Sequence, residues 1–264
     1  MLHRLDHSEF YTVEIPSVSY GGICPKSKRY LYLLPDKKSV HAAKSLMKYL
    51  ITQRGLHQTF RVDWLYKPAN GKMFGVLVCR TTKNEIGFLR AFSGDWEKRQ
   101  CPEGWVPSSG FTKEYAAEQK ITEKQIEELS LQIKELKSLP ENLSLRKEID
   151  KRKMIRGNLS RELTNKIHDA YRFENTLGEV LPLREIFGDA SLPPTGMGDC
   201  CAPKLLQYAI RHNLEPLSMI EFWWGASSKV NPRIQGHFYS ACEPKCYPML
   251  GFLLRGIKAA KSRL

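Results

Sequence analysis

The chain has 264 residues, with 41 Lys and Arg against 28 Asp and Glu, and thus a formal net charge of +13. Its hydrophobic fraction of 42% is typical of a globular protein and excludes wholesale disorder. No apolar run approaches the roughly 20 residues of a membrane span, and the first six residues carry no apolar secretion segment. We therefore expect a cytoplasmic protein without a membrane partner, whose cysteines are reduced or bound to metal.

The positive charge is spread unevenly over three segments. Residues 1–113 carry a net +9, residues 114–175 a net +1 and residues 176–264 a net +3. A basic chain of this kind favours an anionic partner, most often nucleic acid, although a solubilising surface is the alternative. We interpret the segments as the first half of an α/β domain, an inserted helical hairpin, and the second half with a cysteine cluster and a basic tail.

The first segment predicts a helix followed by a β-hairpin. Apolar residues recur at helical spacing over residues 37–53, after the start signal Pro35-Asp36. Residues 72–80 and 85–92 are two apolar runs around the turn residues 82–84, which is typical of paired strands.

The middle segment predicts two long antiparallel helices. Its apolar residues recur at steps of three to five on both sides of the turn signal at residues 139–142. Such a coiled-coil hairpin could also mediate a homodimer. Six cations cluster early in its second helix, and they form either a contact for RNA or a solvated face. They are Arg146, Lys147, Lys151, Arg152, Lys153 and Arg156.

The last segment predicts a helix over residues 201–211, a buried strand over 217–224 and a final helix over 247–257 that ends in a basic tail. The aromatic run Phe222-Trp223-Trp224 lies near Lys229 and Arg233, and such residues can stack on unpaired bases. A core strand is the alternative interpretation. The whole pattern indicates an α+β fold, a small mixed sheet flanked by helices.

Four cysteines in the last segment suggest a zinc site. Cys242 and Cys246 stand four residues apart around a helix start, and Cys200 stands at the start of another helix. Thiolates at two helix N-termini can share one tetrahedral Zn²⁺. The fourth ligand could be Cys201, His237 or water, and buried reduced cysteines are the alternative to a metal site.

The order of helix, two strands, Cys-led helix, strand and helix led by a Cys pair resembles the core of the zinc-dependent nucleobase deaminases. That resemblance implies a hydrolase acting on a nucleobase. Deaminases, however, place a Glu two residues after the first ligand as general acid and base, and Ala202 stands there in this chain. The spacing of the second pair also differs from the usual Cys-x-x-Cys.

Five ordered motifs together resemble a second family over roughly residues 30–257. They are residues 71–78 (GKMFGVLV), 87–94 (GFLRAFSG), 196–209 (GMGDCCAPKLLQYA), 221–225 (EFWWG) and 236–242 (GHFYSAC). They look like the long N-terminal region of a subset of RluA-type RNA pseudouridine synthases. In that family a catalytic domain follows this region, and its nucleophilic Asp matches no position here.

We therefore expect a non-catalytic accessory module that binds RNA, either rRNA or tRNA, and works with a pseudouridine synthase catalytic domain. A zinc-dependent deaminase-like hydrolase and a protein that dimerises through its helical hairpin are the alternatives. RNA contacts are expected from the six hairpin cations together with Lys229 and Arg233.

Overall fold

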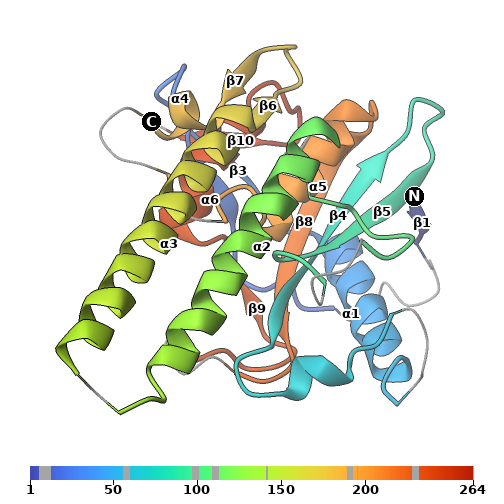
Figure 1. Ribbon diagram of the computed structural model, residues 1–264. Coiled ribbons are helices and arrows are strands. Elements are labelled where there is room, and N and C mark those ends of the chain that lie inside the picture. Colours follow the sequence, from blue (N-terminus) through green and yellow to red (C-terminus); the bar gives the residue numbers. More distant parts are fainter. Residues whose placement is uncertain are drawn as a thin grey trace. The chain divides into compact units, whose positions relative to one another are not determined.

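The computed structural model describes residues 1–5, 13–55, 60–96, 101–108, 113–140, 142–188, 193–194, 196–227 and 232–263 (Figure 1). Its helices are α1 (Lys37–Thr52), α2 (Lys113–Leu136), α3 (Leu143–Ala170), α4 (Leu183–Phe187), α5 (Cys201–Arg211) and α6 (Glu243–Leu253). The strands are β1 (His3–Arg4), β2 (Tyr20–Ile23), β3 (Tyr30–Leu33), β4 (Lys72–Arg80), β5 (Ile86–Phe92), β6 (Arg172–Glu174), β7 (Val180–Pro182), β8 (Glu215–Trp224), β9 (Phe238–Tyr239) and β10 (Lys261–Arg263). The expected α+β class is confirmed.

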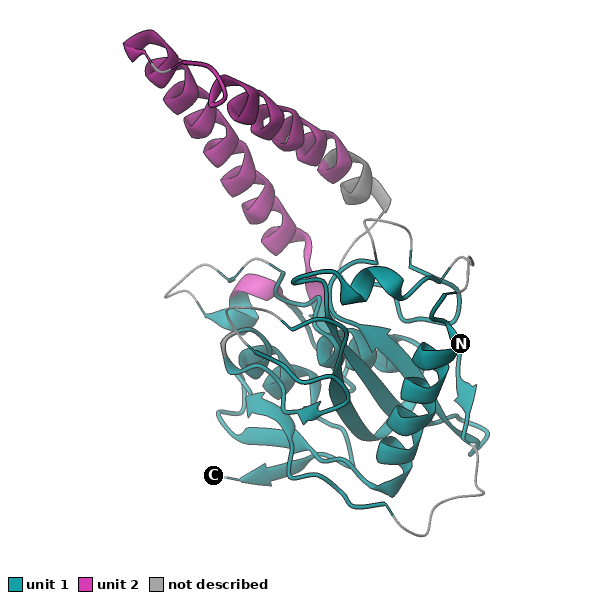
Figure 2. Cartoon of the chain, turned by 90° about the horizontal axis from the view of Figure 1, so that it is seen from below, with its two compact units in different colours: residues 1–109, 173–181, 185–264 teal, residues 110–172, 182–184 magenta. Residues whose placement is uncertain are grey.

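The chain forms two compact units, coloured separately in Figure 2. One contains residues 1–109, 173–181 and 185–264, and the other contains residues 110–172 and 182–184. We call them the α+β unit and the hairpin unit.

A five-stranded sheet with the order β1-β5-β4-β8-β9 forms the centre of the α+β unit. Its described pairs are all antiparallel, whereas we expected a mixed sheet. A tight turn connects β4 to β5. Strand β8, which comes much later in the chain, pairs with the other edge of β4 and is also antiparallel to it. A second antiparallel sheet has the order β10-β3-β2, and β6 and β7 form a separate ribbon.

The two faces of the central sheet differ because side chains alternate along each strand. Phe74 of β4 pairs with Phe222 of β8, and both belong to the hydrophobic core that includes Leu46 of α1. The next pair, Gly75 and Glu221, points to the opposite face, where a Cβ on Gly75 would lie 2.8 Å from the Cβ of Cys201 in α5. Helix α1 therefore covers one face of the sheet and α5 covers the other.

The predicted helix over residues 37–53 is confirmed as α1, and its start has a physical cause. Asp36 accepts a hydrogen bond from the backbone N–H of Ser39 at 2.8 Å, and the hydroxyl oxygen of Ser39 accepts one from the N–H of Asp36 at 2.9 Å. This reciprocal capping box satisfies two N–H groups that a helix start leaves without partners.

The hairpin unit contains the two long helices that the apolar spacing predicted. Ile133 of α2 and Ile149 of α3 are buried, and Arg152 of α3 donates to Gln132 of α2 at 3.0 Å. Other members of the predicted stripes, such as Ile121 and Met154, are more than half exposed at 63% and 62%. The seam between the helices is therefore narrower than the sequence pattern indicated.

The predicted bounds of the last helix are wrong. Helix α6 spans Glu243–Leu253 rather than residues 247–257, with a proline in its first turn and Pro248 in its interior. It ends early because Gly256 adopts a positive φ of 87°, which turns the chain out of the helix. Part of the expected basic tail then pairs with β3 as strand β10.

Within the part of the chain that the structure describes, no helix is both long enough and apolar enough to cross a membrane.

Candidate metal centre

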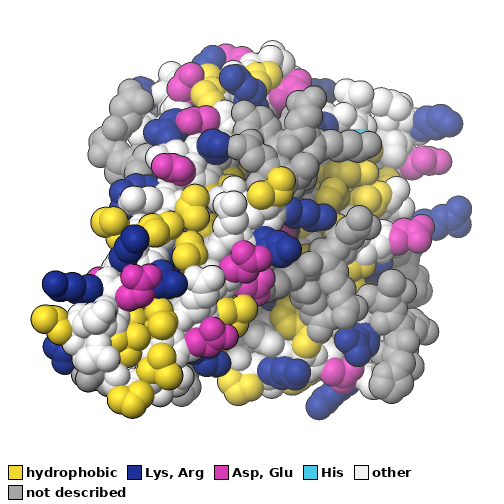
Figure 3. Space-filling model, viewed as in Figure 1, with side chains coloured by type: hydrophobic (Ala, Val, Ile, Leu, Met, Phe, Trp, Pro, Cys, Tyr) yellow, Lys and Arg dark blue, Asp and Glu magenta, His cyan; other side chains and the backbone are white. Residues whose placement is uncertain are grey.

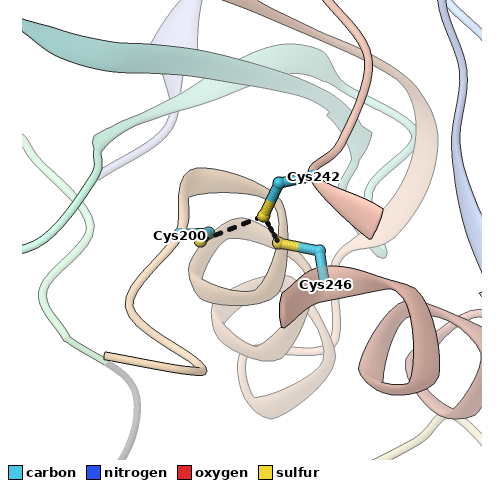
Figure 4. Close-up of side chains that lie close together, drawn as sticks. All are labelled: Cys200, Cys242 and Cys246. Carbon is cyan, nitrogen blue, oxygen red and sulfur yellow. Dashed lines mark hydrogen bonds between the residues drawn. The ribbon is translucent and has the colours of Figure 1, made fainter. Parts of the chain in front are cut away.

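Three cysteines from distant parts of the chain meet at one point (Figure 4). Cys200 precedes α5, Cys242 precedes α6, and Cys246 lies in the first turn of α6. Their sulfur atoms all lie within 4.8 Å of one another, with 3.9 Å between Cys200 and Cys242 and 3.3 Å between Cys242 and Cys246. These three residues, the thiol cluster, could hold a metal ion.

The sulfur separations fit a tetrahedral centre. With metal–sulfur bonds of about 2.3 Å and tetrahedral angles, neighbouring sulfurs lie about 3.8 Å apart. The two measured separations lie on either side of that value. None of the seven cysteines, all of which belong to the described residues, forms a disulfide. The residues present therefore fit a soft divalent ion held by three thiolates.

The electrostatics of the cluster favour a negative charge on Cys242. Hydrogen bonds from the Cys200 and Cys246 thiols hold the pKa of Cys242 well below its ordinary value, and the backbone N–H groups of Lys245 and Cys246 act in the same direction. The same hydrogen bonding raises the pKa of Cys200 and Cys246. Cys242 is therefore poised as a thiolate, whereas a bound cation would have to displace the protons of Cys200 and Cys246.

The two residues that we considered as a fourth ligand lie outside the cluster. Cys201 is completely buried, and its thiol donates to the backbone carbonyls of Met73 at 3.3 Å and Ala91 at 3.7 Å. Its sulfur is therefore directed at the sheet. His237 is not among the residues whose ligand atoms gather at the cluster. The described residues supply three ligands.

Glu221 is a functional candidate that the sequence reasoning did not assign to the site. Its carboxylate, only 5% exposed, accepts a hydrogen bond from the backbone N–H of Ala202 at 2.7 Å. Burial, together with the nearby Cys242, raises its pKa to about 8. Its signal in the sequence was its isolation as the only charge in the apolar stretch 217–224. The structure thus places a protonatable carboxyl group at the N-terminus of α5, beside the cluster.

Three of the cations predicted to contact RNA are paired within the hairpin unit. In α3, Arg152 pairs with Glu148, Lys153 with Asp150 at 2.8 Å, and Arg156 donates to Ser130 at 3.5 Å. Exposed pairs of this kind contribute little stability and can exchange for phosphate. In the view of Figure 3, cationic, anionic and hydrophobic side chains are interspersed over α2 and α3. An RNA contact by the hairpin stays a prediction.

Of the two remaining predicted cations, Arg233 belongs to the described residues and its side chain lies against β9. Lys229 lies outside the described residues. The guanidinium of Arg233 lies 4.1 Å from the ring centroid of Tyr239. The aromatic run over residues 222–224 is mostly core, because Phe222 and Trp224 are buried.

A cavity of about 540 Å³ with mixed polar and apolar walls opens elsewhere in the α+β unit, where β4 ends and β8 begins. Arg80 and Glu215 line it as an ion pair with 3.3 Å between their charged atoms. It contains none of the residues that the sequence predicted for a site.

Neither family models, nor curated proteins, nor solved structures match this chain. The two family resemblances therefore stay predictions.

Proposed function

We propose that this chain is a non-catalytic RNA-binding module that works with an RNA pseudouridine synthase domain. The observation that carries the proposal is the excess of positive charge in both units of the chain. The α+β unit holds 26 Lys and Arg against 17 Asp and Glu, and the hairpin unit holds 15 against 11. A folded unit with a net charge of +9 attracts the phosphate backbone of RNA over distances of about one Debye length.

The test is binding of a fluorescent structured RNA, followed by anisotropy at increasing salt. Affinity should fall as salt rises, with a log–log slope of about −0.7 to −0.9 for each phosphate contact. The hairpin contribution is tested by changing Lys147 and Lys151 to Gln, with Lys120→Gln and Lys124→Gln in α2 as the matched control. Absence of RNA binding at about 50 mM salt would contradict the proposed function.

We further propose that the thiol cluster holds one zinc ion that ties α5 to α6. Zinc prefers thiolate ligands in tetrahedral geometry and contributes directly to folding at such sites. Elemental analysis of purified protein should find one zinc per chain, and Cys242→Ser should abolish it. Cys101→Ser is the control because Cys101 lies outside the cluster, with its thiol directed at the carbonyl of Trp105 at 3.5 Å. Zinc retained in full by Cys242→Ser would refute the assignment.

A second candidate function, a zinc-dependent hydrolase of the deaminase type, is favoured by Glu221. Deaminases take their proton-carrying Glu from the helix of the first ligand, where this chain has Ala202. Glu221 reaches the same helix end from β8, because it accepts the N–H of Ala202 at 2.7 Å. Zinc would supply Lewis acidity, and Glu221 would carry the proton to the leaving ammonia. If the wild type releases ammonia from nucleosides and Glu221→Gln does not, this candidate is established. If the wild type releases no ammonia, the candidate is excluded.

A further inference from the structure

The second sheet presents an aromatic and basic face formed by residues that are far apart in the chain. In the register of β3 with its neighbours, Tyr30 stands opposite Ile23 and Arg263, and Tyr32 stands opposite Lys261. Residues directly opposite one another point to the same side of a sheet, as do residues two apart on one strand. These five side chains therefore share one side, which we call the tyrosine face.

The tyrosine face is open to solvent. Ile23 is 47% exposed, the three residues of β10 are exposed, and the two tyrosines are half-buried. The opposite side of the same sheet is covered, because Leu33 is buried and a Cβ on Gly22 would lie 1.5 Å from the backbone oxygen of Tyr247 in α6. One side of the sheet thus packs on α6 and the other presents rings and cations.

The rings on this face are already arranged for stacking. The guanidinium of Arg263 lies 4.5 Å from the ring centroid of Tyr30 and 5.5 Å from that of Tyr32. The two tyrosine rings lie 5.8 Å apart, and the ring of Tyr247 lies 5.4 Å from Tyr30. Planar π surfaces and a guanidinium plane therefore stand next to one another, with the exposed Lys261 opposite Tyr32 on the same side of the sheet.

We propose that the tyrosine face binds single-stranded RNA. Unpaired bases would stack on Tyr30 and Tyr32, and Arg263 and Lys261 would contact phosphates. The rings favour an unpaired strand, because the base faces of a duplex are already stacked. The cations favour a polyanion over an apolar protein surface. This inference rests on the proposed RNA binding and names the surface responsible.

The test uses a fluorescein-labelled single-stranded RNA of about ten nucleotides, with the same sequence as a duplex for comparison. The double variant Tyr30→Ala and Tyr32→Ala should bind the single strand at least tenfold more weakly, because it removes both rings on which bases would stack. The variant Tyr30→Phe and Tyr32→Phe keeps the rings and should stay within about twofold of the wild type. Arg263→Ala, at an exposed position, should also lose affinity, whereas Lys83→Gln in the β4–β5 turn is the charge-matched control.

The outcomes separate this inference from the proposed function. If the wild type binds RNA and both the double alanine variant and Arg263→Ala bind it equally well, the tyrosine face is refuted while RNA binding stands. If the wild type binds no RNA at about 50 mM salt, both proposals fail. Equal affinity of the wild type for the single strand and the duplex would refute stacking. If the wild type is a dimer, the double alanine variant is a monomer and both bind RNA equally well, the face is a protein contact instead. Should the alanine variant fail to fold, Arg263→Ala still decides the question, because unchanged RNA affinity in that variant would refute the tyrosine face.

Discussion

Replacing Glu221 by Gln should remove a strong pH dependence of stability. Burial raises the pKa of Glu221 from an ordinary 4.5 to about 8. Between these two values the unfolded chain ionises this carboxyl group while the folded chain keeps its proton. The folded state therefore binds more protons, and the free energy of unfolding falls as pH rises until the folded pKa is passed.

The expected size follows from the shift. Each pH unit within this window corresponds to about 1.4 kcal/mol, so the wild type should lose roughly 4 kcal/mol between pH 5 and pH 8 relative to Glu221→Gln. Gln does not titrate, and its side-chain oxygen can still accept the N–H of Ala202. The difference between the two proteins should level off above the folded pKa.

The assay is urea unfolding followed by tryptophan fluorescence, with a chelator and a reductant present so that metal does not contribute. Two of the reporting residues, Trp96 and Trp105, are buried in the core. Glu85→Gln, an exposed carboxylate in the turn before β5, is the control and should show no such trend. A difference between wild type and Glu221→Gln that is constant from pH 5 to pH 8 would refute the reasoning.

Four further substitutions test the packing around the site and the hairpin. Lys204 is buried and donates to two backbone carbonyls at 3.1 and 2.7 Å, so Lys204→Met should lower the free energy of unfolding by about 2–4 kcal/mol in urea. Gly22→Ala places a Cβ 1.5 Å from the carbonyl oxygen of Tyr247 and should destabilise by about 3 kcal/mol or more, whereas Gly157→Ala, with no neighbour within 4 Å, should stabilise α3. Burial lowers the pKa of His168, so the unfolded chain takes up a proton there at a higher pH than the folded chain does. Thermal melts should therefore show the wild type losing stability relative to His168→Gln as pH falls below about 6.5.

The sequence predicted those parts of the fold that have strong local signals. Helix α5 has the bounds that its proline and apolar spacing indicated, and β4 matches the apolar run over residues 72–80. Strands β2, β3 and β10 were missed because each has only three or four residues, and β10 pairs with β3 across more than two hundred residues of chain. That long-range pairing depends on tertiary contacts, which no local propensity encodes.

The candidate site was only partly predictable for a related reason. The three cysteines were selected because each stands at a helix start, a position that sequence can indicate. Glu221 comes from a strand, and its approach to Ala202 depends on the register between β4 and β8 and on how α5 packs over that face. The alternation Tyr30-Leu31-Tyr32 after two basic residues was a usable signal for the tyrosine face, but its partner Arg263 could be placed only by the structure.

Helix α6 connects the thiol cluster to the tyrosine face. Cys246 and Tyr247 are neighbours in its sequence; the first belongs to the cluster, and the ring of the second lies 5.4 Å from Tyr30. The same helix packs closely on β2, since a Cβ on Gly251 would lie 2.3 Å from the carbonyl carbon of Ile23. A metal ion that fixes the first turn of α6 would therefore also fix the sheet that carries the tyrosines.

Removal of zinc should therefore weaken the binding of single-stranded RNA. Chelation or Cys242→Ser should reduce the affinity, Cys101→Ser should not, and the double tyrosine variant should keep its full zinc content because its side chains lie outside the cluster. Linkage requires that RNA strengthen zinc binding by the same factor by which zinc strengthens RNA binding. Competition with a chromogenic chelator, with and without RNA, measures that factor. An unchanged RNA affinity after verified loss of zinc would show that the cluster and the tyrosine face are energetically independent.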